Sequence, residues 1–227
     1  MKILTLLSLL FFYRAIALIP ENGISLEYDT FVISNPNSIK NIFKNDIFLE
    51  TDRLILRQIR SEDADDILDL ASHPQVTQYT AALELIHTKK DAQELIAIMT
   101  QRYQLDLPTR WAIVYKPENK VIGICGFVGY SASFCRAEIG YALNYTYWGK
   151  GIATEATKAI IEFGFNHMHL NRIEATVDPN NQGSIHVIEK VGMKYEGTLR
   201  QHIWSKDEYR DRLIYSVLKN EYLLYRH

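Results

Sequence analysis

Two glycines separated by one residue, Gly149 and Gly151, stand between a predicted strand and a predicted helix. The residues before them, 138–143, are typical of a strand, and the apolar residues from Ile152 to Phe163 recur with helical spacing. Glycine reaches positive φ at little cost, so such a segment can turn sharply and direct several N–H groups toward one point. The chain must therefore place the end of a strand beside the start of a helix.

A Gly149-Lys150-Gly151 turn that opens a helix is suited to binding a phosphate or pyrophosphate. Its N–H groups and the positive end of the helix dipole both favour an anion. No Gly-Lys-Ser/Thr sequence closes the turn, so it is not a Walker A loop, and the spacing of a dinucleotide-binding fingerprint is absent. Taken alone, the turn is more often an ordinary helix entry.

A second strand, turn and helix follow the first. The alternation in residues 173–177 predicts a strand, residues 178–181 a turn, and residues 184–191 a helix that Gly192 ends. An Asn or Ser N-cap accounts for much of this segment without any functional role.

The rest of the pattern adds strands and helices on both sides of these two segments. The predicted order is one strand, two helices, three strands, a helix, a strand, a helix and two strands. This order predicts an α+β domain with a mixed sheet. The further strands are expected at residues 53–57, 111–115, 121–128, 193–200 and 209–218, and the further helices begin after Ser61 and Thr88.

Composition excludes several classes of protein. Of the 227 residues 47% are apolar and 23% charged, which excludes a largely disordered chain. A net charge of −2 argues against a nucleic-acid binder that acts through a broad basic field. Two cysteines, Cys125 and Cys135, are too few for a disulfide-dense scaffold or a Cys-rich zinc module. The cysteines lack the companion residues of a nucleophile, and His167-Met168-His169 lacks further metal ligands. We therefore expect no metal. Because of the net charge, we also expect no nucleic-acid partner.

The first 47 residues are expected to form a leader or linker, with the domain over residues 48–227. The apolar run Ile3–Tyr13 has the length of a signal peptide and is too short to span a bilayer comfortably. Ala15-Ile16-Ala17 resembles a cleavage site, although Arg14 precedes it. An apolar helix docked on the domain and a non-native leader from an upstream start are the alternatives.

The sequon Asn144-Tyr145-Thr146 lies directly beside the glycine turn. A glycan there would obstruct the expected anion site, which argues against a eukaryotic secretory route. We therefore expect a cytoplasmic protein without membrane attachment. Export or anchoring through the apolar run remains the alternative.

Taken together, the two segments resemble the GNAT N-acetyltransferase family, and within it the ribosomal-protein-alanine N-acetyltransferase (RimJ/RimL) branch. That branch has a Glu-Ile-Gly-Tyr strand, a Tyr-Trp-Gly-x-Gly-x-Ala-Thr-Glu-Ala loop and helix, and a Pro-x-Asn-x-x-Ser…Glu-Lys-x-Gly-Phe element. These stand here as Glu138–Tyr141, Tyr147–Ala156 and Pro179–Met193, and Glu50–Arg57 resembles the opening of the branch. The resemblance covers residues 48–222.

The resemblance implies a GNAT-like fold, mostly antiparallel and flanked by helices, with splayed central strands, and acetyl-CoA as the acetyl donor. The backbone of residues 148–154 would hold its pyrophosphate. The strand ending at Leu143 would expose backbone groups to the pantetheine arm, and Asn181 and Ser184 match family positions near that arm and the thioester. The implied cofactor-binding residues are Tyr141, Ala142, Leu143, Trp148, Gly149, Lys150, Gly151, Ile152, Ala153, Thr154, Asn181 and Ser184.

The implied reaction is direct attack of an amine on the thioester. Free α-amino groups titrate near pH ~8, and a positioned base that takes the proton contributes roughly 10²–10⁴-fold. Glu138 is our candidate base, although a surface glutamate on a strand would look the same. Ser184 is our candidate for protonating or hydrogen-bonding the departing thiolate, and it also suits a helix N-cap. Many relatives have a tyrosine acid where Glu189 stands, and Tyr215 is a distant alternative.

The branch resemblance implies a protein N-terminal α-amino group as the acceptor. A small amine such as a polyamine or antibiotic, or a non-catalytic acyl-CoA-binding module, are the alternatives. We expect residues 73–90 and 201–212 to flank the acceptor groove.

Overall fold

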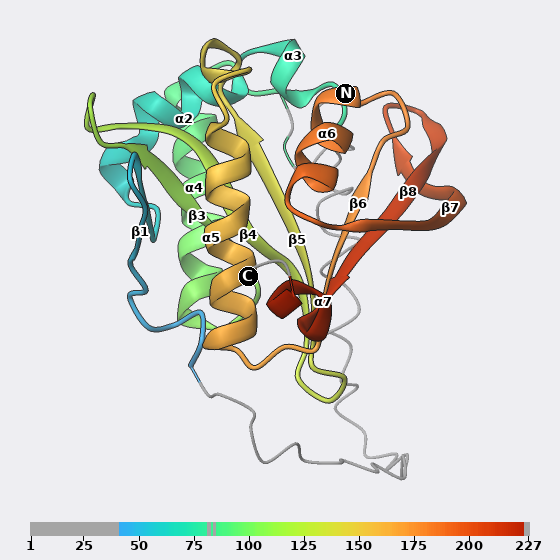
Figure 1. Ribbon diagram of the computed structural model, residues 1–227. Helices are drawn as coiled ribbons and strands as arrows, with labels where there is room; N and C mark the ends of the chain where they lie inside the picture. The colour runs from blue at the N-terminus through green and yellow to red at the C-terminus, as the bar shows by residue number, and fades with distance from the viewer. Residues whose placement is uncertain (1–40, 81–82, 84, 225–227) are drawn as a thin grey trace, which may run out of the picture. The chain divides into compact units, whose positions relative to one another are not determined.

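One eight-stranded sheet organises the part of the chain that the structure, a computed structural model, describes: residues 41–80, 83 and 85–224. The strand order is β1-β2-β3-β4-β5-β6-β8-β7 (Figure 1). The predicted α+β fold with a mixed sheet is confirmed. The strands are β1 (Leu49–Glu50), β2 (Leu54–Arg57), β3 (Arg110–Tyr115), β4 (Lys120–Ser131), β5 (Arg136–Leu143), β6 (Arg172–Val177), β7 (Lys194–Ser205) and β8 (Glu208–Leu218). The helices are η1 (Ser61–Asp63), α2 (Ala64–Ala71), α3 (Pro74–Thr77), α4 (Lys89–Gln104), η2 (Tyr145–Tyr147), α5 (Ile152–Asn166), α6 (Gln182–Lys190) and α7 (Lys219–Leu224).

The sheet is antiparallel except where β5 meets β6. These two strands pair in parallel over only three positions, Arg136–Glu138 with Arg172–Glu174. Beyond them β5 continues to Leu143 and β6 to Val177 without pairing to each other. Figure 1 shows the two strands diverging, as the family resemblance implied. The divergence leaves unpaired backbone on the facing edges of both strands.

Charged side chains fix the start of β6 to its neighbours β7 and β8. Arg172 donates to Glu174 over 2.8 Å and to Glu196 on β7 over 2.8 Å. Ser216 on β8 donates to the same Glu196 over 2.6 Å. The hydrogen bonds from Arg172 and Ser216 lower the pKa of Glu196 to about 2. This network ties β6, β7 and β8 together where the separation begins.

Helices cover the two faces of the sheet, with α2 and α4 on one side and α5 on the other (Figure 1). α4 begins after Thr88, as predicted, and its first turn is a capping box: the Asp91 N–H donates to Thr88 Oγ1, and the Thr88 N–H donates to the Asp91 carboxylate. α5 packs on the sheet through Phe163, whose ring meets that of Trp111 edge-on at 5.6 Å. Trp111 is fully buried, so the centre of the core lies between β3 and α5.

Most of the predicted leader, residues 1–47, lies outside the described residues. Its last residues include Ile42 and Phe43, which are buried in the domain core. The ring of Phe43 packs edge-on against Phe127 and Tyr130 of β4. Among the described residues, no helix has the length and apolar character needed to cross a membrane.

The short elements β1, α3 and α7 were not predicted, and several predicted elements differ in length, α6 and β7 among them. β1 has two residues and α3 has four, too few to display a period. α6 starts two residues before the expected Ser184, because the side chain of Asn181 serves as its N-cap. β7 reaches Ser205 because its pairing with β8 resumes beyond an irregular stretch.

Replacing Gly164 of α5 by alanine is expected to lower the free energy of unfolding by about 1–2 kcal/mol. A Cβ atom there would lie 2.8 Å from Ile173 Cδ1 and 3.1 Å from Leu170 Cδ1. This crowding outweighs the gain of about 1 kcal/mol that alanine brings to a helix. Urea unfolding measures the effect. Gly183→Ala in α6 is the matched control, because its nearest neighbour would be Asn181 Oδ1 at 3.8 Å. Equal losses in both variants would contradict the packing argument.

Candidate functional site

The glycine turn presents a run of unused backbone donors at the start of α5. Gly149 and Gly151 both have a φ of +74°, and Gly151 is the N-cap of the fifteen-residue helix. Within the described residues, no acceptor meets the backbone N–H groups of residues 149–154. The first amide with a partner is that of Glu155, which donates to the Gly151 carbonyl over 3.0 Å. Free amides at the positive end of a helix suit an anion.

The residue before the turn differs from expectation. The Trp148 N–H donates to the Tyr145 carbonyl over 3.1 Å, so this amide is engaged and the free donors begin at Gly149. The Trp148 indole N–H donates to the Leu143 carbonyl over 2.8 Å, which fixes the end of β5 against the turn. The indole itself is 48% exposed, which leaves its ring accessible to a ligand.

A clamp from the start of the domain holds the turn in place. The Arg53 guanidinium contacts the Glu155 carboxylate through Nε at 2.7 Å and donates to the Lys150 carbonyl over 2.9 Å. Thr51 Oγ1 donates to the same carboxylate over 2.6 Å. Burial alone would raise the pKa of Glu155, but the hydrogen bonds from Thr51 and Arg53 outweigh it and lower that pKa. The first turn of α5 is therefore fixed to β2.

Sequence reasoning gave these clamp residues no role. Arg53 and Glu155 both lie inside the quoted motifs, yet they are separated by 102 positions. A glutamate in the first turn of the helix that follows the glycine turn was the available signal. Nothing in the pattern alone identifies its partner.

Tyr141 and Ser184 meet across the opening between the diverging strands. Tyr141 Oη lies 2.9 Å from Ser184 Oγ, which joins β5 to the helix that follows β6. The Ser184 N–H donates to Asn181 Oδ1 over 3.1 Å, so Asn181 is the N-cap of α6. Burial raises the pKa of Tyr141 to about 12, so its hydroxyl is neutral at neutral pH and can donate a proton in a hydrogen bond.

Glu138 occupies the last paired position of β5, where the two strands separate. Its Oε1 accepts a hydrogen bond from Thr176 Oγ1 over 2.8 Å. Its Oε2 has no donor in the described part of the chain, and the residue is only partly buried. One carboxylate oxygen is thus held and the other is available to accept a proton.

Other groups considered from the sequence are placed away from this arrangement. Tyr215 Oη donates to Glu189 over 3.5 Å, and burial raises the pKa of Tyr215. Cys125 is buried, and burial raises the pKa of its thiol to about 12. A thiol of that kind is unreactive at neutral pH.

The two segments expected to flank the acceptor contact each other. Lys206, in the turn between β7 and β8, donates to the carbonyl of Gln78 over 2.8 Å. Arg212 on β8 donates to the carbonyl of Tyr79 over 3.3 Å. The hairpin of β7 and β8 is therefore held against the segment that follows α3.

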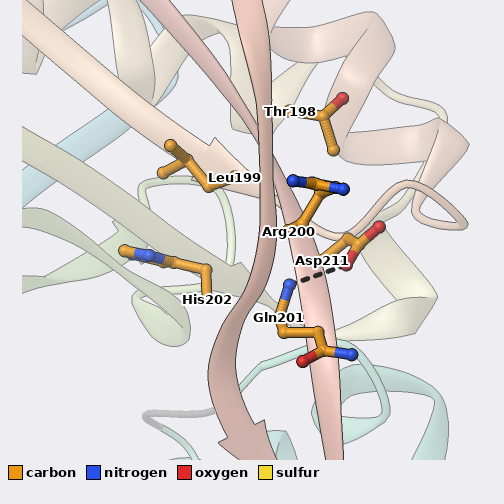
Figure 2. Close-up of a pocket in the computed structure, with 6 residues that line it drawn as sticks. All are labelled: Thr198, Leu199, Arg200, Gln201, His202 and Asp211. Atoms are coloured by element: carbon orange, nitrogen blue, oxygen red, sulfur yellow. Dashed lines mark hydrogen bonds between the residues drawn. The ribbon is translucent and has the colours of Figure 1, made fainter.

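The same hairpin carries a hollow of about 770 Å³ (Figure 2). The pairing of β7 with β8 shifts between Leu199 and Ile203. There the Gln201 N–H donates to Asp211 Oδ1 over 2.8 Å instead of to a strand carbonyl. Figure 2 shows Leu199 and His202 on one side of β7 and Asp211 on the other. The hollow is lined by Thr198, Leu199, Arg200, Gln201, His202 and Asp211.

These parts lie at one end of the sheet and are chemically complementary. The free amides of residues 149–154 can hold an anion, and the unpaired edges of β5 and β6 can bind an extended chain. The Tyr141–Ser184 pair and Glu138 can donate and accept a proton at the point where the strands separate. The site can therefore hold a long phosphorylated ligand with its reactive end near a base.

Comparisons with known proteins agree with this geometry. The family profile described as "Acetyltransferase (GNAT) domain" matches residues 53–194. The uncharacterized N-acetyltransferase p20 of Bacillus licheniformis is 37% identical over 174 residues, which cover 77% of this chain and 97% of p20. A GNAT-family acetyltransferase structure from Bacillus anthracis is 28% identical with a TM-score of 0.68, over 77% of this chain and 99% of that one. RimJ of Mycobacterium smegmatis in complex with CoA-disulfide is 22% identical with a TM-score of 0.70, over 78% of this chain and 90% of that one.

We expect Glu155→Gln to destabilise the protein at pH 7 by about 1–3 kcal/mol, the range for hydrogen bonds to a charged group. The folded-state pKa of Glu155 is lowered, so its contribution is present above its unfolded pKa and is lost as the pH falls. The difference between wild type and variant should therefore shrink between pH 5 and pH 3, measured by urea unfolding.

Glu94→Gln is the control for this experiment, because Glu94 makes only an exposed pair with Lys90 at 3.8 Å. This variant should change stability little at either pH. A Glu155→Gln difference that stays constant on acidification would refute the clamp.

Proposed function

The chain belongs to the GNAT acetyltransferase family and is an N-acetyltransferase, and we propose that its acceptor is the α-amino group of a protein N-terminus. We assign this activity to the domain of residues 48–227. The motifs shared with the RimJ/RimL branch, Glu138–Tyr141 and Tyr147–Ala156, support this choice of acceptor.

The proposal needs a bound acetyl donor, and the observation that carries this part is the run of unbonded amides at residues 149–154. Acetyl-CoA, when bound, supplies an acetyl thioester that an amine attacks with release of the CoA thiol. The turn would hold its pyrophosphate, and the unpaired edges of β5 and β6 would hold its pantetheine arm. The site fits such a ligand, because no side chain or carbonyl among the described residues accepts from these amides.

We assign proton transfers to two groups at the point of separation. Glu138 Oε2 would take the proton that the amine loses, while Thr176 holds Oε1 in place. On the opposite side, Ser184 would donate to the leaving sulfur and draw on the neutral hydroxyl of Tyr141 at 2.9 Å. This pair replaces the tyrosine that many relatives have at the position of Glu189.

Gly149→Ala should raise the Kd for acetyl-CoA about tenfold or more, because alanine resists a φ of +74° and the turn would relax. Calorimetry with acetyl-CoA measures the change. Gly192→Ala is the matched control: Gly192 has a φ of +87°, and neither glycine has a neighbour within 4 Å of a new Cβ. Both variants bear similar backbone strain, so only the first should lose affinity. An equal loss in both would remove the turn from the binding site.

Peptides with a free N-terminus should be acetylated in an acetyl-CoA-dependent way, and the same peptides with a blocked N-terminus should not. Glu138→Gln should lower kcat by roughly 10²–10⁴-fold, the contribution expected of a general base. Its Kd for acetyl-CoA should stay unchanged, because Glu138 lies away from the turn. Mass spectrometry of the peptides and thiol release measure both effects.

Two results would count against these assignments. Acetylation of lysine side chains or polyamines with no N-terminal product would reject the proposed acceptor. Full turnover by Glu138→Gln would reject the proposed base and leave the acceptor untouched.

A further inference from the structure

Arg110 on β3 carries a guanidinium group without a partner. In the described part of the chain it makes no side-chain hydrogen bond and no ion pair, although the residue is only partly exposed. The backbone carbonyl of Arg110 accepts a hydrogen bond from the Tyr103 hydroxyl, but the side chain makes none. The other described arginines that are not exposed all have partners: Arg53, Arg57, Arg102, Arg172, Arg210 and Arg212.

Two glycines give the Arg110 side chain its path across the sheet. Gly126 on β4 pairs with Arg110 on one side and with Gly140 of β5 on the other, so the three positions share one face. A Cβ on Gly140 would lie 3.6 Å from an Nη atom and 3.8 Å from Nε of Arg110. The guanidinium therefore ends over β5, close to the opening between β5 and β6.

Glu138 projects from the same face of β5, two positions before Gly140, at a strand spacing of about 7 Å. The charges of Arg110 and Glu138 attract each other, yet no ion pair joins them. The structure thus holds a cation and a carboxylate on one face of β5, with no ion pair between them among the described residues. A ligand that carries both an amine and a carboxylate would satisfy both groups.

An unpaired cation in this position does not stabilise the fold. The residue is only partly exposed, and this burial lowers the pKa of Arg110. Removing a charge from water without pairing it is costly. Such a cost is typical of a group kept for binding.

We propose that Arg110 binds a carboxylate of the acceptor and thereby selects amines that carry a carboxylate close to the reacting nitrogen. This inference rests on the proposed N-acetyltransferase function. Two sources share the chemistry: a peptide whose N-terminal residue is acidic, which agrees with the proposed acceptor, and a free α-amino acid, which would replace it. Guanidinium is suited to the task because its planar fork matches a carboxylate in a bidentate manner.

Neighbouring charges also disfavour a polycationic acceptor. Arg212 interacts with Glu138 electrostatically, and it lies 3.3 Å from Asp178. Arg210 lies 3.7 Å from the same carboxylate. Asp178 is thus already paired with two arginines of the chain and offers no free carboxylate to a polyamine.

The test compares acceptors that differ only in a carboxylate. One arm pairs Asp-Ala-Ala-amide with Asn-Ala-Ala-amide, and the other pairs alanine with alaninamide. We expect wild type to prefer the carboxylate member of one pair by about 10–100-fold in kcat/KM, and the responding pair identifies the source. Arg110→Gln should reduce that preference to near one, with the amide acceptors unaffected. Arg110→Lys, which keeps the charge but loses the fork, should give an intermediate preference.

Arg136→Gln is the matched control, because Arg136 is exposed on the same strand as Glu138 and lies 4.0 Å from Glu174. It should keep the wild-type preference. Urea unfolding of Arg110→Gln should show stability equal to or above that of wild type, whereas a structural role would lower it. Calorimetry with CoA present should show that the preferred acceptor binds wild type and not Arg110→Gln.

Each outcome bears on a different statement. Acetylation of the carboxylate and amide members at equal rates would overturn the role of Arg110 and leave the proposed function standing. A carboxylate preference that persists in Arg110→Gln would also overturn the role of Arg110 and leave the proposed function standing. No acetylation of any acceptor, together with no binding by calorimetry, would reject both.

Discussion

The short parallel pairing between β5 and β6 is the constraint on which the rest of the site depends. Every other neighbour in the sheet is antiparallel, so only here do two adjacent strands run in the same direction and end beside helices that start together. Pairing over three positions holds the strands at one end and releases them at the other. The N-termini of α5 and α6 are thereby brought to the same opening, with Tyr141 and Ser184 in contact across it.

Much of this arrangement was predictable, because local chemistry determines it. The glycines at 149 and 151 require a turn, and Thr88 with Asp91 specifies a helix start, so both elements follow from neighbouring residues. Asn181 is the N-cap of α6 for the same kind of reason. The splayed strands were inferred from a family resemblance. The sequence of one strand does not indicate where the neighbouring strand separates from it.

What the sequence could not supply are contacts that depend on register between distant strands. The clamp of Arg53 on Glu155 needs the placement of β2 beside α5. The path of Arg110 needs three strands in register, with Gly126 and Gly140 at the same level. In the sequence, Arg110 is simply a charged residue at the start of an apolar strand, and the glycines look like ordinary interruptions of a strand.

The clamp has a consequence for how the anion-binding turn comes into being. During synthesis the ribosome releases Arg53 long before Glu155, and the turn gains its support only when both have emerged and β2 has joined the sheet. A strand, glycine turn and helix cut out as a fragment would lack that support. An amino-terminal truncation past Arg53 would leave a chain that retains every residue of the turn but not the two side chains that hold it.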